Sequence, residues 1–70
     1  MSDIQELSFE TAFEELETII ERLDSGELPL DESVTLYERG RQLATRCQAL
    51  LDEAELRVQK LLDDGTLAEL

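Results

Sequence analysis

The chain has 70 residues, a formal net charge of −12, one cysteine and no histidine, and aromatic residues make up 4% of it. A chain this short and this poor in aromatics buries only a small core, which usually needs a staple or a partner for stability. One cysteine excludes an internal disulfide, and the absence of histidine and of a second cysteine excludes the usual metal clusters, so we expect no metal or cofactor. Association with another chain remains as the source of stability.

The charge and hydropathy pattern limits the class of partner. Affinity for phosphate groups comes from lysine and arginine, so this acidic chain should not bind nucleic acid or an anionic membrane by itself. No apolar run approaches the roughly 18 residues that span a bilayer. The opening MSDIQELSFE shows neither the basic start nor the apolar segment of a signal peptide. We therefore expect a cytoplasmic protein that makes no contact with membranes.

The first expected element is an amphipathic helix over about residues 9–24. Ser8 precedes it as an N-cap, and Gly26 and Pro29 mark its end. Its apolar residues recur at steps of three and four, as on one helix face. That stripe consists of Phe9, Ala12, Phe13, Leu16, Ile19, Ile20 and Leu23.

A longer helix is expected over about residues 30–62, followed by a short tail at 63–70. Its seam repeats every seven residues for about four heptads, as in a coiled coil. The seam consists of Leu30, Ser33, Tyr37, Gly40, Ala44, Cys47, Leu51, Ala54, Val58 and Leu61. A glycine inside a helix is unfavourable by roughly 1 kcal/mol relative to alanine. We therefore expect Gly40 to be compensated by the close approach of the first helix.

These elements predict an all-α fold, an antiparallel two-helix hairpin that forms one domain over residues 1–70. At 1.5 Å per residue the helices measure roughly 24 Å and 50 Å, so the first covers only half of the second. The residues expected to pack within the hairpin are Phe9, Phe13, Leu16, Ile20, Leu23, Tyr37, Gly40 and Ala44. The residues expected to contact partner chains in a coiled-coil-like bundle are Leu43, Cys47, Leu50, Leu51, Ala54, Val58, Leu61 and Leu62.

No catalytic residue is expected. Glu10, Glu14, Glu17 and Glu21 share one helix face, but a solvated outer surface explains them better than a metal or acid–base site, because two helices form no water-excluding cleft. Cys47 occupies a seam position without a histidine to activate it, which is typical of a packing cysteine.

Three segments in this order and at this spacing resemble a known family: ELETIIERLDSGELPLDES, YERG and CQALLDEAELRVQKL. Over residues 7–61 the chain closely resembles the small subunit of bacterial exodeoxyribonuclease VII. The resemblance implies a non-catalytic accessory subunit of a hydrolase that degrades single-stranded DNA from either end to oligonucleotides with 5'-phosphates. It also implies that several small subunits attach to the helical region of one large subunit and that single-stranded DNA is met only through the complex.

Two other functions fit the sequence. Carboxylates could imitate DNA phosphates in an inhibitor, and binding would then weaken steeply as salt rises. Alternatively, the seam could drive self-association of a stand-alone helical adaptor. Self-association in isolation is also compatible with an accessory subunit, because both would use the same seam.

Overall fold

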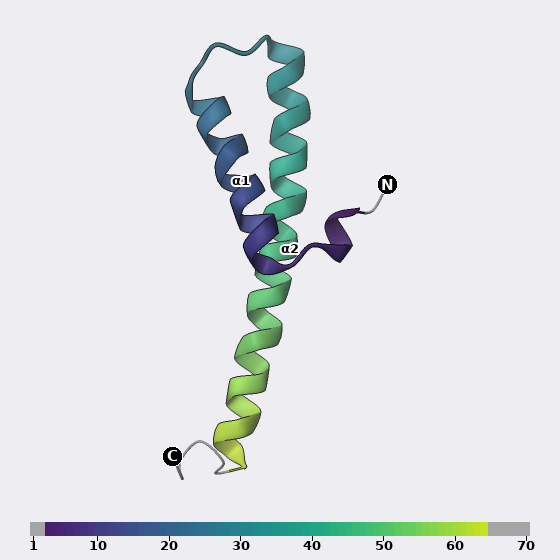
Figure 1. Ribbon diagram of the computed structural model, residues 1–70, viewed down its shortest axis with the longest axis vertical. Coiled ribbons are helices and arrows are strands. Elements are labelled where there is room, and N and C mark those ends of the chain that lie inside the picture. Colours follow the sequence, from purple (N-terminus) through teal and green to yellow (C-terminus); the bar gives the residue numbers. More distant parts are fainter. Residues whose placement is uncertain (1–2, 65–70) are drawn as a thin grey trace.

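The seven-residue repeat and its turn residues produce two helices joined by a short loop. The computed structural model describes residues 3–64. It contains a 3-10 helix, η1 (Asp3–Glu6), followed by α1 (Phe9–Asp24) and α2 (Leu30–Asp63). Figure 1 shows α1 beside the first half of α2, with the second half of α2 extending alone and η1 on the far side of α2 from α1. The all-α class is confirmed, and the tail from residue 65 onward lies outside the described residues.

Local sequence signals set the ends of the helices. The Ser8 hydroxyl accepts a hydrogen bond from the backbone N–H of Thr11 at 3.2 Å, which caps α1. Gly26 adopts a φ of 70°, a left-handed conformation that reverses the chain after α1. Pro29 stands at the N-cap of α2 without a side-chain capping bond. The Asp31 carboxylate instead accepts a hydrogen bond from the backbone N–H of Glu32 at 3.0 Å.

The core is small and lies between α1, the first half of α2 and η1. Its fully buried members are Ala12 and Leu43, each with 0% of its surface exposed. The other buried apolar residues are Ile4, Ile19 and Cys47. Side chains of Leu7, Phe9, Leu16, Leu23 and Leu36 pack around this centre and remain half-buried. The buried apolar surface that stabilises the fold is thus concentrated where α1 packs against α2.

Gly40 is buried and faces side chains of α1, which agrees with the expected contact between the two helices. A Cβ atom built on Gly40 would stand 3.4 Å from Cγ2 of Ile19 and 3.6 Å from Cδ1 of Leu16. Those are ordinary van der Waals separations, so one methyl group fits there in contact with α1. The contact compensates the unfavourable helix propensity of glycine.

The short helix η1 extends the core beyond the two helices of the hairpin. Ile4 is 6% exposed, and Arg46 Nε donates a hydrogen bond to the Leu7 carbonyl at 3.2 Å. No element was predicted for this segment from the sequence, because four residues are too few to show a helical period. Its burial is a tertiary effect that local pattern does not reveal.

The second half of α2 has no intrachain cover within the described residues. The 34 residues of α2 correspond to about 51 Å of helix, against about 24 Å for α1. The described part of the chain accordingly measures 55 Å along its longest axis and only 14 Å along its shortest. Every described side chain from Leu51 onward is exposed.

Substitutions at Gly40 test the close approach of the two helices. Gly40→Ala should keep or slightly raise stability, because a methyl group fits and alanine favours the helix. Gly40→Leu should lower the free energy of unfolding by about 1–3 kcal/mol through overpacking against Leu16 and Ile19. Urea unfolding followed by circular dichroism measures both. A leucine variant as stable as the alanine variant would contradict the proposed contact.

Candidate partner interface

An exposed apolar strip runs along the uncovered half of α2. We define the distal strip as Leu51, Ala54, Val58, Leu61 and Leu62. Its leucines and valine are 40–52% exposed although one side of each faces its own helix. Polar side chains occupy other positions of the same segment, and Arg57 Nη2 lies 3.6 Å from Glu53 Oε1. Contiguous exposed apolar surface is typical of protein interfaces, so the strip is a candidate interface.

A second apolar concavity lies along one edge of the hairpin, between α1 and α2. This hairpin groove has a volume of about 260 Å³, and its lining is almost entirely apolar. Gly40 is one of the residues that line it. The lining residues are Leu16, Ile19, Ile20, Leu23, Tyr37, Gly40, Arg41 and Ala44.

The opposite edge of the hairpin is closed by η1 and an ion-pair network on Arg39. The Arg39 guanidinium donates to both carboxylate oxygens of Glu15, at 2.7 and 3.2 Å, and to both oxygens of Asp3, at 3.3 and 3.2 Å. Hydrogen bonds from Arg39 hold the pKa of Asp3 below its ordinary value, and those to Glu15 and then Asp3 raise the pKa of Arg39. One cation therefore ties η1, α1 and α2 together.

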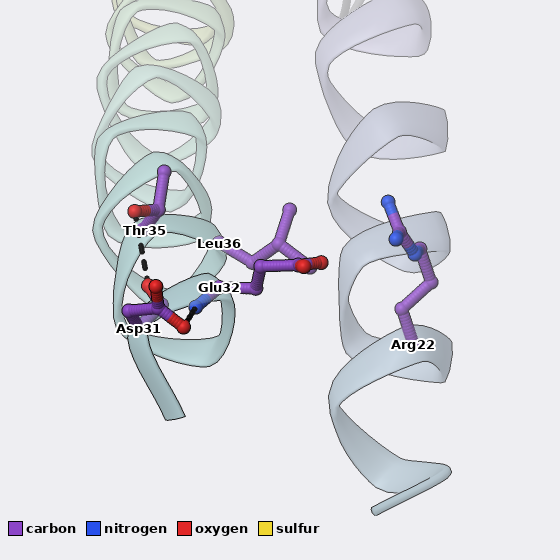
Figure 2. A pocket seen from close by; sticks show the side chains of 5 residues that line it. All are labelled: Arg22, Asp31, Glu32, Thr35 and Leu36. Carbon is purple, nitrogen blue, oxygen red and sulfur yellow. Dashed lines mark hydrogen bonds between the residues drawn. The ribbon is translucent and has the colours of Figure 1, made fainter. Parts of the chain in front are cut away.

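A shallow polar pocket of about 300 Å³ lies near the loop end of the hairpin (Figure 2). Glu32 and Leu36 extend from α2 toward α1, and Arg22 lines the pocket from α1. Asp31 and Thr35 are engaged with their own helix, since the Thr35 hydroxyl donates to the Asp31 carbonyl at 3.1 Å. These groups form helix-start contacts, and no cleft there excludes water.

Within residues 3–64, no group of three or more carboxylate or cysteine side chains is arranged to hold a metal ion. Among the helices described, none combines the length and the apolar content needed to cross a membrane. Cys47 is buried, which fits the packing role expected from its seam position. The arrangement offers apolar surface for protein contact.

Two residues predicted at the partner interface lie in the core of the hairpin. Leu43 has no exposed surface and Cys47 is 7% exposed, because α1 and η1 reach further along α2 than the sequence analysis allowed. Both are therefore removed from the interface. Leu50 is half-buried at the boundary, and the distal strip retains the rest of the predicted set.

Several residues predicted to pack within the hairpin are instead half open to solvent. Phe13 is 44% exposed, Ile20 48% and Tyr37 61%, and Ala44 is also exposed. They lie on the side of the hairpin that η1 does not cover, and no other described element packs against that side. Phe9, Leu16, Leu23 and Gly40 do pack within the hairpin.

The residues that close the other edge were not predicted from the sequence: Ile4, Leu7, Glu15, Arg39 and Arg46. The only available signal was the apolar pair Ile4 and Leu7, three residues apart among acidic neighbours. Arg39 pairs with Glu15, which is 24 positions away, and with Asp3, which is 36 positions away. Ion pairs between residues so far apart leave no local pattern in the sequence.

The model of the family described as exonuclease VII small subunit matches residues 9–60 of the chain, which include α1 and most of the distal strip. The chain belongs to the exonuclease VII small subunit family. Members of this family are accessory subunits of a hydrolase complex, and the acidic DNA mimic and the stand-alone adaptor find no support in the match.

Curated relatives agree with the exonuclease VII small subunit assignment. A protein of Bradyrhizobium sp. (strain ORS 278) named exodeoxyribonuclease 7 small subunit is 53% identical over 66 residues, which are 94% of this chain and 80% of that protein. One of the same name from Rhodopseudomonas palustris (strain TIE-1) is 57% identical over 64 residues, 91% of this chain and 77% of that protein. Another from Afipia carboxidovorans is 51% identical over the same share of each chain.

The Arg39 network makes a pH-dependent contribution to stability. Because the folded-state pKa of Asp3 is lowered, its ion pair contributes fully above the ordinary pKa of 3.8 and is lost as the pH falls through the lower folded value. Asp3→Asn should therefore lower the melting temperature at neutral pH, and this difference from the parent chain should vanish well below pH 3.8.

Thermal unfolding followed by circular dichroism across that pH range measures the difference. Asp24→Asn serves as the control, because among residues 3–64 Asp24 takes part in no ion pair. A decrease for Asp3→Asn that persists unchanged at the acid end would contradict the network.

Proposed function

We propose that this chain binds the helical region of the exonuclease VII large subunit through the distal strip and thereby stabilises and orients that region. The observation that supports the proposal most directly is the strip itself, because its leucines and valine are 40–52% exposed and the chain belongs to a family of small subunits. Burying apolar surface is favourable by about 25 cal/mol per Å², so a matching helical seam is the natural cover.

The proposed complex degrades single-stranded DNA in the cytoplasm, and the large subunit supplies the DNA-binding and catalytic groups. The net charge of −12 supports this division of labour, because the small subunit offers few cations to phosphate groups. We also propose several small subunits per large subunit. One chain measures only 55 Å in its longest dimension, so a long helical region offers room for more than one copy.

Charge placed in the distal strip should prevent assembly. Leu51→Glu combined with Val58→Glu would bury two carboxylates in an apolar seam, and we expect a loss of about 3 kcal/mol, roughly a hundredfold in Kd. The measurement is co-purification of the variant with a tagged large subunit, followed by titration of the purified chains.

Leu56→Glu provides a matched control on the same segment. Leu56 is 69% exposed, but it lies on a different side of α2, two residues from Val58. This variant should assemble like the parent chain. If the double variant bound as tightly as the control, the distal strip would not be the interface.

A further inference from the structure

The hairpin groove and the distal strip belong to one face of α2. Tyr37 and Ala44 line the groove, and Leu51 and Val58 belong to the strip. These four residues are spaced by seven, which keeps them on the same side of the helix with a drift of only about 20° per heptad. All four are exposed. The open edge of the hairpin and the uncovered end of α2 therefore form a continuous apolar track.

The first helix supplies the other wall of this track and an acidic rim. Around Ile20, the helix neighbours at three- and four-residue spacing are Leu16 and Leu23 on the inner side and Glu17 and Asp24 on the outer side. Leu16 and Leu23 line the groove, whereas Glu17 and Asp24 are exposed. The same spacing places Glu10 beside the half-exposed Phe13. The apolar wall is thus bordered by carboxylates along its whole length.

We propose that one straight amphipathic helix of the large subunit occupies the entire track, from the hairpin groove to the distal strip, with basic residues along the side that faces Glu10, Glu17 and Asp24. This inference rests on the proposed function and extends its interface into the hairpin. The track from Tyr37 to Leu61 measures about 36 Å, which a helix of about 24 residues matches. In the hairpin half the result is a packed three-helix unit.

Charge selects this occupant over a second copy of the chain. The end of α2 from Asp52 to Asp64 carries five carboxylates and two cations, so it would bring negative charge to an acidic rim. Like charges brought together across an interface disfavour association, whereas a basic flank would be attracted. The side chain of Arg41 is the single cation that lines the groove, and it stands on the α2 side.

Two alanines on opposite sides of α2 allow a matched test in the assembled complex. In a Cys47→Ala background, Ala44→Cys places a thiol in the groove, Ala49→Cys places one on the other side of the helix, and Val58→Cys reports on the strip. Maleimide labelling rates are measured for the small subunit alone and in complex with the large subunit. We expect the large subunit to slow labelling of Ala44→Cys and Val58→Cys by at least about tenfold and to leave Ala49→Cys nearly unchanged.

The outcomes separate this inference from the proposed function. Protection of Val58→Cys without protection of Ala44→Cys would overturn the groove assignment and leave the distal interface intact. Absence of protection at both sites would overturn both proposals. A benzophenone maleimide attached to the Ala44→Cys thiol identifies the neighbour: cross-linking to the large subunit supports the inference, and cross-linking to a second small subunit overturns it.

The acidic rim is tested by charge reversal. Glu17→Lys combined with Asp24→Lys should weaken binding to the large subunit about tenfold at low salt and reduce its dependence on salt. Glu14→Lys combined with Glu21→Lys makes the same change at the same spacing on the side of α1 away from Ile20. Equal effects of the two pairs would show a general charge effect and would overturn the choice of a basic helix.

Discussion

The close contact between α1 and α2 at two small residues determines the rest of this structure. Ala12 has no exposed surface, and Gly40 leaves room for the side chains of Leu16 and Ile19. Leu43 is fully enclosed in the core cluster that also contains Ala12, although the chain has few large apolar residues from which to form a core. A chain of 70 residues with few aromatics depends on such a concentrated contact.

The two edges of that contact differ: one is covered by the chain itself and the other is exposed. On one edge, Ile4 and the Arg39 network close the seam, so its apolar residues contribute to the fold. On the other edge the seam stays open and carries Ile20, Tyr37 and Ala44 at the surface. In the assembly proposed above, a helix of the large subunit covers this open edge and continues along α2.

Hydrophobic periodicity was sufficient to predict the hairpin, because both helices are long and amphipathic and their turn carries Gly26 and Pro29. The role of Gly40 followed from the same pattern, since an unfavourable residue in a regular seam indicates close packing. The pattern could not tell which flank of the seam would be covered. That depended on η1, which buries Ile4 and pairs Asp3 with Arg39, residues 36 positions apart. Leu43 and Cys47 were assigned to a partner for this reason, and Tyr37 was assigned to the core.

The continuity of α2 has a geometric consequence for the evolution of this chain. The helix passes from the hairpin to the uncovered half without interruption, and Cys47 and Leu51 lie on either side of that boundary. Each residue inserted or deleted between them would rotate one half against the other by about 100° and shift it by 1.5 Å. An extension at the loop or beyond Asp64 causes no such rotation. In the proposed assembly one partner helix contacts both halves of α2, so an insertion between Cys47 and Leu51 should be tolerated far less than one at either end of the hairpin.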